Sequence, residues 1–266
     1  MNPVSLDTLC AALCYAAGIE APAQAAEANP ALCAYLDETG AAGKCDRIFM
    51  YNPDAIAHWI SDKHPDFIEE VKSIAPLALP LRAVMPSVTP VCFGTMYTGA
   101  QPEVHGIRAY QKPVIKIDTI FDAMLRAGKR CAIVCTDGDS LSRIYNEREI
   151  DYFYYPTLDE VNAKAAELII DDKYDLIVVY NGDYDGTMHR WGTEHPLSLG
   201  ALRANSHAFA MFASLIDMHW QKHTTLLGFA MDHGCHDIDG GCGSHGLDMD
   251  EDLDILHFYR VLPPVL

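Results

Sequence analysis

Basic residues are scarce in this sequence. Lys and Arg total 19 against 37 Asp and Glu, which gives a formal net charge of −18 at pH 7. Nucleic-acid duplexes and anionic membrane surfaces are bound through basic patches, so this balance argues against both as main partners. The acidic excess has two explanations at this level: it keeps a cytoplasmic protein soluble, or some of the carboxylates bind divalent cations, whose charge the sum leaves out.

Signals for export and for membrane insertion are also missing. The segment 1–26 contains the apolar run Leu9–Ile19, but no Lys or Arg precedes Lys44, and Asp7 stands where a signal peptide would have its basic leader. An amphipathic helix capped by Ser5 is therefore expected here. No stretch approaches the roughly 20 apolar residues of a membrane-spanning helix. The sequence predicts a cytoplasmic protein with no membrane partner.

The nine cysteines lack the regular spacing of a disulfide framework. Four lie in apolar stretches: Cys10, Cys14, Cys131 and Cys135. A free thiol packs in such places as a small hydrophobic group. Cys235 and Cys242 could hold a structural zinc ion, but no CxxC pair accompanies them. Reduced thiols of a cytoplasmic protein are the simpler interpretation.

Short apolar runs alternate with segments of helical periodicity. The runs predicted as buried strands are Arg47–Asn52, Leu81–Met85, Arg130–Thr136, Tyr174–Tyr180, Thr225–Met231 and Leu253–Val261. The predicted helices are Leu6–Ala17, Pro30–Glu38, a segment ending at Ile60, Thr119–Ala127, Leu158–Ile170 and Ser198–Gln221. Nearly continuous apolar strands separated by helices predict an α/β fold with a mostly parallel central sheet and helices on both faces.

We expect one domain over residues 1–266, because no internal repeat, low-complexity segment or linker divides the chain. Residues 1–45 would form a helical N-terminal extension packed on this domain. The segment Asp137–Pro156 has less regular patterning than its neighbours, which predicts an excursion over the surface.

Polar side chains follow four of the predicted strands. In chain order these are Asp54, Thr89, the segment Asn181–His189, and Asp232-His233, followed by a glycine-rich loop with His245. Ligands of such sheets bind beyond the carboxyl ends of the strands. Each feature alone has an ordinary explanation, since an Asp after a strand is commonly a helix N-cap.

Taken together, these groups predict a metal site. Asp and His side chains that converge without basic partners would repel one another or lose their charge unless cations lay between them. Mixed Asp and His ligation suits zinc, and suits manganese or iron less selectively.

Thr89 has two possible roles. A threonine hydroxyl is a poor nucleophile at neutral pH unless a base or a metal ion lowers its pKa. Thr89-Pro90 also fits a plain helix start, with threonine as N-cap and proline as the first helical residue. The backbone N–H groups and the dipole of such a helix would attract a phosphate. The neighbouring candidate ligands favour the nucleophile.

These motifs resemble the alkaline phosphatase superfamily, and most closely its type I phosphodiesterase/nucleotide pyrophosphatase branch. That branch has a nucleophilic Thr before a TG…P…HGI stretch, matched by Thr89, Thr98-Gly99, Pro102 and His105-Gly106-Ile107. Its D-x-x-x-H, D-H-G and H-G elements are matched by Asp185 with His189, by Asp232-His233-Gly234 and by His245-Gly246. The resemblance runs from about Asp54 to the C-terminus. His105 is expected to be structural rather than catalytic.

The resemblance implies a two-metal phosphohydrolase with an alkaline phosphatase-like core. One metal ion would be held by Asp185, His189 and His245. The other would be held by Asp54, Asp232 and His233, with Thr89 bound to it as an alkoxide. The family implies two zinc ions and in-line displacement through a phosphothreonine. Oxygen and nitrogen ligands of this kind could also take manganese. The expected substrates are small-molecule phosphate esters, with phosphodiester or nucleotide pyrophosphate bonds preferred.

Several positions depart from the family pattern. Ala55 follows Asp54 where the family usually has Gly. No Asn, which would help to hold the phosphate, occurs between Thr89 and His105, and Cys92 stands near the expected place. The sulfatase pattern C-x-P-x-R is absent around Thr89, which disfavours sulfate esters.

Other functions stay open. A phosphomutase or a phosphonate hydrolase of the same superfamily would use the same ligands. A mutase must shield its phosphoenzyme from water, and the stretch after Thr89 has no room for a large cap. A non-catalytic metal-binding module on this fold is the remaining alternative.

Overall fold

The computed structural model describes residues 4–265, and a seven-stranded sheet forms its centre. In spatial order the strands are β2 (Leu77–Arg82), β9 (Asp254–Leu262), β6 (Thr225–Phe229), β1 (Arg47–Pro53), β5 (Leu176–Asn181), β3 (Cys131–Thr136) and β4 (Asp151–Tyr155). Only β9 runs antiparallel to its neighbours, β2 and β6. The predicted α/β fold with a mostly parallel sheet is confirmed.

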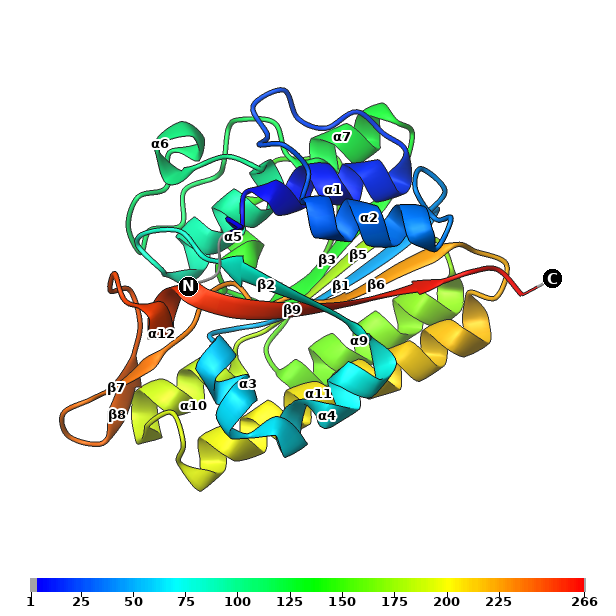
Figure 1. Ribbon diagram of the computed structural model, residues 1–266. Helices are drawn as coiled ribbons and strands as arrows, with labels where there is room; N and C mark the ends of the chain where they lie inside the picture. Colours follow the sequence, from blue (N-terminus) through cyan, green and yellow to red (C-terminus); the bar gives the residue numbers. More distant parts are fainter. Residues whose placement is uncertain (1–3, 266) are drawn as a thin grey trace.

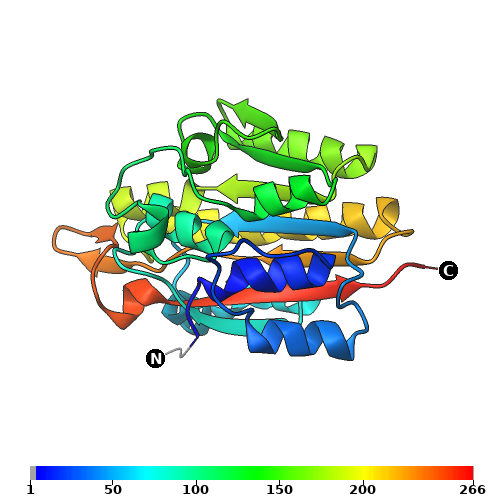
Figure 2. The same cartoon turned by 90° about the horizontal axis from the view of Figure 1, so that it is seen from above.

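Helices cover both faces of this sheet (Figures 1 and 2). One face carries α1 (Thr8–Ala17), α2 (Pro30–Glu38), α5 (Thr89–Thr98), α6 (Pro102–His105), α7 (Ile120–Arg126) and α8 (Leu141–Ile144). The other carries α3 (His58–Lys63), α4 (Pro65–Ile74), α9 (Leu158–Asp171), α10 (Asp183–Trp191) and α11 (Pro196–His219). Within residues 4–265, none of these helices has the length and apolar character needed to cross a membrane.

A short hairpin and a short helix lie beyond one end of the sheet (Figure 1, left). The hairpin consists of β7 (His236–Ile238) and β8 (Cys242–Ser244), and the helix is α12 (Asp250–Leu253). The hairpin packs against α10. This end of the molecule is where β1, β5 and β6 reach their carboxyl ends (Figure 1).

The three central strands are buried almost completely, which explains their continuous apolar sequences. Every residue of β5 and β6 is buried, and so is every residue of β1 after Arg47. Strands covered on both faces need apolar side chains in both directions. On one face, the Phe49 and Tyr51 rings of β1 lie 5.3 and 5.7 Å from the Phe212 ring of α11.

The two edge strands differ from the predictions. β2 spans Leu77–Arg82 rather than Leu81–Met85. Pro80 lies within it, which an edge strand tolerates because one side of its backbone has no partner. β4 lies inside the segment Asp137–Pro156, for which an irregular excursion was predicted. Its residues are mostly half-buried, so they lack the apolar run that identifies a central strand.

The N-terminal residues are anchored to the sheet, although not in the predicted way. Ser5 does not cap the first helix, since α1 begins at Thr8 after Asp7. Ser5 instead forms a parallel bridge with Arg82 of β2, and its carbonyl accepts a hydrogen bond from the Thr8 hydroxyl at 2.7 Å. Helix α1 packs on α5 and α7. The assignment of residues 1–45 as an extension of one domain stays a prediction.

All nine cysteines are free thiols. Cys235 is fully buried, with its sulfur 3.7 Å from the Tyr184 hydroxyl. The Cys242 thiol donates to the Arg190 carbonyl. These two cysteines therefore make separate contacts.

Candidate active site

All the residues predicted for the site come together at the carboxyl edge of the sheet. β1 lies between β5 and β6, so the segments that follow these three strands are neighbours. They carry Asp54 after β1, Asp185 and His189 on α10 after β5, and Asp232 and His233 after β6. His245 follows β8, and Thr89 opens α5.

Asp54, Asp232 and His233 form a cluster that we call the buried triad. Their candidate ligand atoms all lie within 4.8 Å of one another. Nε2 of His233 is 3.4 Å from Asp54 Oδ1 and 3.4 Å from Asp232 Oδ2. At most 1% of any of these side chains is exposed. Carboxylates so far removed from water require a compensating charge.

Asp185, His189 and His245 form a second cluster, the open triad, with candidate ligand atoms again within 4.8 Å. Oδ1 of Asp185 is 3.2 Å from His189 Nε2 and 3.3 Å from His245 Nε2. Asp185 and His189 are four residues apart on α10 and so share one face of the helix. The His189 side chain is 42% exposed. Asp183 is exposed and belongs to neither triad.

His245 connects the two triads. Its ring is stacked on that of His233, with centroids 4.1 Å apart, and lies 4.9 Å from the ring of His189. Nε2 of His245 is 3.1 Å from Nε2 of His189. The six side chains therefore make one continuous cluster.

Backbone carbonyls orient all three imidazoles. The Nδ1 atoms of His189, His233 and His245 donate to the carbonyls of Gly243, Gly234 and Ser87 at 3.0, 2.9 and 2.8 Å. Because a carbonyl can only accept, each Nδ1 carries a proton, and in the neutral imidazole each Nε2 presents a lone pair to the cluster. Two lone pairs that face each other at 3.1 Å, as in His189 and His245, repel unless a cation lies near. Metal-binding histidines are oriented in this way.

One oxygen of each carboxylate lacks a hydrogen bond. Asp54 Oδ1, Asp185 Oδ1 and Asp232 Oδ2 are buried without a donor. The second oxygens of the buried triad are occupied, because the Tyr180 hydroxyl donates to Asp54 Oδ2 and the Ala55 N–H donates to Asp232 Oδ1 at 3.2 Å. Unpaired buried oxygens are costly, and oxygens that face imidazole lone pairs suit divalent cations. These residues fit two metal ions.

Burial and mutual repulsion shift the pKa of the three carboxyl groups. Burial, with the charge of Asp185, raises the pKa of Asp54 to about 7. Burial, with the charge of Asp54, raises the pKa of Asp232 well above its usual value. Burial acts in the same direction on Asp185, but the close approach of the His189 and His245 rings outweighs it and lowers the pKa. A divalent cation would favour the charged form of all three groups.

Thr89 lies against the buried triad and is 3% exposed. The alternative role of Thr89, as the N-cap of α5, is wrong, because the N-cap is Val88 and Thr89 is the first helical residue. Val88 has the extended backbone typical of an N-cap, and Pro90 follows one residue later than expected. The Thr89 hydroxyl is therefore not used for capping. It donates to Asp54 Oδ2 at 3.3 Å and lies 3.5 Å from His233 Nε2.

Ala55, which stands where the family usually has Gly, adopts a backbone conformation that favours glycine. Its φ angle is +62°, in the left-handed region. This turn aims the Ala55 N–H at Asp232 Oδ1. A side chain in this conformation costs roughly 1–2 kcal/mol. The substitution therefore keeps Asp54 in the cluster at a small cost in backbone energy.

Tyr180 supports the site but was not predicted from the sequence. Its hydroxyl donates to Asp54 Oδ2 from near the end of β5. The apolar run around it indicated only a strand. Its place at the carboxyl end of that strand was the available signal.

Asp252 of α12 is a second unpredicted supporting residue, and it is fully buried. Its Oδ2 accepts the Leu247 N–H at 2.8 Å, and its Oδ1 lies 2.6 Å from His236 Nδ1. Its carbonyl accepts the Gly234 N–H at 2.8 Å. Asp252 thus joins the loop after β6 to the loop after β8, and no sequence motif indicated this.

His105 and Cys92 are both buried in contacts within their own part of the fold. His105 Nε2 lies 3.1 Å from the Thr95 hydroxyl, and its Nδ1 accepts the Ile107 N–H. The Cys92 thiol donates to the Val84 carbonyl at 3.8 Å. The hydrogen-bonding group of each side chain is thus already engaged.

A family model described as type I phosphodiesterase/nucleotide pyrophosphatase matches residues 53–261 of this chain. The matched part includes Thr89 and every residue of both triads. No curated protein sequence matches the chain.

Several solved structures share the fold. Murine ectonucleotide pyrophosphatase/phosphodiesterase 5, an inactive form in complex with AMP, has a TM-score of 0.58 and 17% identity, covering 73% of this chain and 59% of that chain. The human protein has a TM-score of 0.58 and 18% identity, covering 73% and 58%. Phosphonoacetate hydrolase from Sinorhizobium meliloti, in complex with phosphonoformate, has a TM-score of 0.55 and 17% identity, covering 76% and 60%. The chain thus spans less than two thirds of the length of these neighbours.

Proposed function

Because this chain belongs to the type I phosphodiesterase/nucleotide pyrophosphatase family, we propose that it is a metal-dependent hydrolase that cleaves phosphate esters through a phosphothreonine on Thr89. Phosphodiesters or nucleotide pyrophosphate bonds are the preferred substrates. The observation that carries this proposal is the convergence of six oriented ligands beside one buried hydroxyl that does not cap its helix.

The buried triad and the open triad would each hold one divalent cation. Three carboxylate oxygens without hydrogen bonds and three imidazole Nε2 lone pairs supply the ligand atoms. Zinc is the proposed metal, with manganese as an alternative, because zinc accepts mixed Asp and His ligation. When bound, such a pair of cations stabilises the charge on the attacking and the leaving oxygens of an in-line displacement.

The residues around Thr89 prepare its hydroxyl for attack. Oδ2 of Asp54, 3.3 Å from the hydroxyl, is placed to take the proton. Thr89 Oγ1 then forms a bond to phosphorus while the bond from phosphorus to the leaving oxygen breaks. A water molecule next hydrolyses the phosphothreonine, and it must arrive from the solvent-exposed side, where His189 lies. Burial of Thr89 keeps other water away from the hydroxyl.

Thr89→Ala tests the proposal, with Thr89→Ser as the matched control that keeps a hydroxyl. Both variants would be assayed on bis-p-nitrophenyl phosphate with added zinc. We expect the alanine variant to lose at least about 10³-fold in kcat and the serine variant to keep measurable turnover. Both should bind as much metal as the wild type. Unchanged turnover in Thr89→Ala would rule out the threonine mechanism.

A second candidate function is hydrolysis of a phosphonate. It is favoured by the structural likeness to a phosphonoacetate hydrolase at a TM-score of 0.55. Release of inorganic phosphate from phosphonoacetate, measured beside release of p-nitrophenol from the diester, separates the two activities. A phosphomutase would instead move phosphate to an acceptor, and a non-catalytic module would bind metal without turning over either compound.

The proposed location is the cytoplasm. Nine free thiols support it, because disulfides form and persist in oxidising compartments.

A further inference from the structure

A tyrosine and a lysine lie close together in the connection between α6 and α7. Residues 106–119 of this connection form no helix or strand. Nζ of Lys112 donates to the Gly138 carbonyl at 2.8 Å and lies 5.4 Å from the centroid of the Tyr110 ring. Tyr110 is 62% exposed. The lysine is thus held in place by a backbone carbonyl and an aromatic ring.

Gly138 places this lysine at the edge of the sheet that carries the triads. It lies in the turn directly after β3, which pairs in parallel with β5, with Val134 opposite Val179. The carboxyl ends of parallel strands lie at the same edge, so the turn after β3 is next to the segment that leads from β5 into α10. Helix α10 carries Asp185 and His189 of the open triad.

The electrostatic surroundings agree with this placement. Burial and then the charges of Asp185 and Asp54 raise the pKa of Tyr110. Burial also raises the pKa of Asp139 in the turn after β3, where the Lys112 charge opposes the shift and the Asp185 charge adds to it. Tyr110 and Asp139 are therefore within electrostatic range of the triads, and Lys112 is within range of Asp139.

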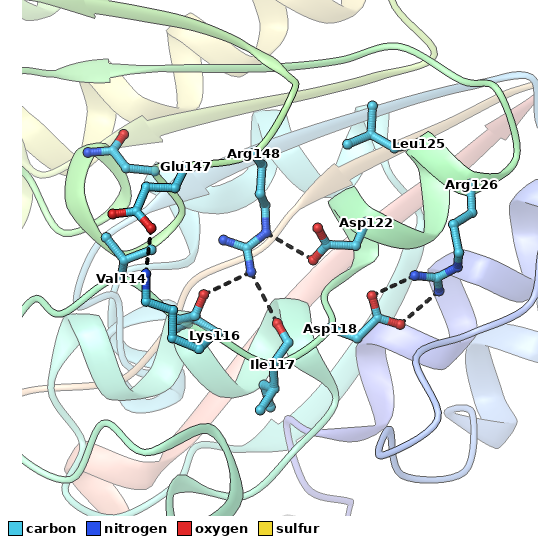
Figure 3. Close-up of a pocket in the computed structure, with 11 residues that line it drawn as sticks. Val114, Lys116, Ile117, Asp118, Asp122, Leu125, Arg126, Glu147 and Arg148 are labelled. Atoms are coloured by element: carbon cyan, nitrogen blue, oxygen red, sulfur yellow. Dashed lines mark hydrogen bonds and ion pairs between the residues drawn. The ribbon is translucent and has the colours of Figure 1, made fainter.

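Lys112 is within electrostatic range of Asp139 but forms no salt bridge with it. Among residues 4–265, Lys112 forms no ion pair, and its one hydrogen bond goes to a neutral carbonyl. Lys116, four residues further along, pairs with Glu147 at 2.5 Å (Figure 3). Arg126 and Arg148, which line the same pocket as Lys116, are also paired, with Asp118 and Asp122 (Figure 3). Lys112 is thus a cation that no salt bridge occupies, and an anionic group can bind to it.

We propose that Lys112, supported by Tyr110, binds a second anionic group of the substrate, separate from the phosphoryl group that reacts at Thr89. This inference rests on the proposed function and narrows its substrate class. The preferred compounds carry a further phosphate or a carboxylate on the part of the molecule that does not react. In so acidic a protein, an unpaired cation beside the site attracts such groups over neutral ones.

The test compares Lys112→Met with Lys116→Met, a matched control in the same connection whose charge is already paired. Three substrates are used with zinc-loaded protein. Bis-p-nitrophenyl phosphate has no second anionic group. ATP carries further phosphates and is cleaved by water to AMP and pyrophosphate, and phosphonoacetate carries a carboxylate. We expect Lys112→Met to raise KM about tenfold for a substrate with a second anion, as suits a partly exposed charge contact, and less than twofold for the diester. Lys112→Arg should restore most of the loss.

The outcomes show whether the second anionic group is a phosphate or a carboxylate. They also separate the role of Lys112 from the proposed function. A loss with ATP identifies a phosphate as the group bound, and a loss with phosphonoacetate identifies a carboxylate. Equal losses on all three substrates, or equal losses in Lys112→Met and Lys116→Met, would overturn the role of Lys112 while the proposed function stood. The role also fails if the wild type turns over the diester and neither charged substrate. No turnover of any substrate would remove the proposed function, and this inference with it.

Discussion

Solvent reaches the two triads very differently. In the buried triad, the Asp54 and His233 side chains are 1% and 0% exposed. In the open triad, the Asp185 and His189 side chains are 21% and 42% exposed. Both triads offer only carboxylates and imidazoles as candidate ligands. The buried triad has two carboxylates and one imidazole, and the open triad has one carboxylate and two imidazoles.

The difference follows from the elements that carry each triad. The buried triad comes from segments directly after β1 and β6, which are adjacent strands at the centre of the sheet. The open triad comes from α10 and from the loop after β8, both at the edge of the fold. Strand ends of a covered sheet give rigid positions without water, whereas a helix surface beside a hairpin leaves one side open. We infer that the buried triad sets the position of Thr89 and that water enters at the open triad.

The largest effect is expected when one histidine of each triad is replaced by alanine and the two variants are compared. His233→Ala should lower kcat/KM by at least about 10³-fold and remove one bound metal ion, because no water can replace the lost ligand in a closed site. His189→Ala should lower kcat/KM by about 10–100-fold, because water can occupy the open position. Metal content and turnover of bis-p-nitrophenyl phosphate would be measured for both at rising zinc concentration. Equal losses, or recovery of His233→Ala in excess zinc, would contradict the comparison.

The next largest effect is on the free energy of unfolding of the metal-free protein, and it comes from Asp54. Burial, with the charge of Asp185, raises the pKa of Asp54 from 3.8 to about 7, so the folded state holds a proton that the unfolded state releases. This contribution to stability is complete below about pH 4 and is lost as the pH rises to about 7. The loss should be about 2–4 kcal/mol for such a shift in a fully buried group.

The contribution of Asp54 to stability can be measured by urea unfolding of the wild type and Asp54→Asn. Both proteins are unfolded in a chelator at pH 5 and at pH 8. The wild type should lose more stability between the two values than the variant. With metal bound, the difference between the two pH values should reverse, since the ligand must be deprotonated. Parallel pH profiles of wild type and variant would show that Asp54 is not the responsible group.

The smallest effect is expected at Ala55. Ala55→Gly removes a side chain from a left-handed backbone position with φ of +62°. The relief of strain and the loss of a buried methyl group oppose each other, so the free energy of unfolding should change by less than about 1 kcal/mol. Thermal unfolding and diester turnover check this. A drop of more than tenfold in activity would mean that the Ala55 side chain has a role of its own.

The sheet and the candidate ligands could be predicted from the sequence because both leave local signals. Continuous apolar runs identified β1, β5 and β6. Asp and His at the ends of several of those runs indicated the candidate ligands, because their combination, unlike each residue alone, has no ordinary structural explanation. The spacing of Asp185 and His189 corresponds to one helical turn, although helix α10 itself was not predicted.

The supporting residues could not be predicted because their partners are distant in the chain. Tyr180 and Asp54 are 126 residues apart, and Tyr180 lies in a strand whose residues are all buried. The carbonyl of Ser87, which orients His245, carries no side-chain information at all. β4 and β2 were missed or misplaced because edge strands are only partly buried, so their residues do not have to be apolar.

Asp252 links the two loops that carry the His233 and His245 imidazoles. Because its backbone and carboxylate hold both the loop of His233 and the loop of His245, any shift of α12 moves these loops together. The separation of the two stacked rings, 4.1 Å between centroids, is then maintained even if the loops shift against the sheet. One residue that belongs to neither triad thus sets the spacing of the two candidate metal sites.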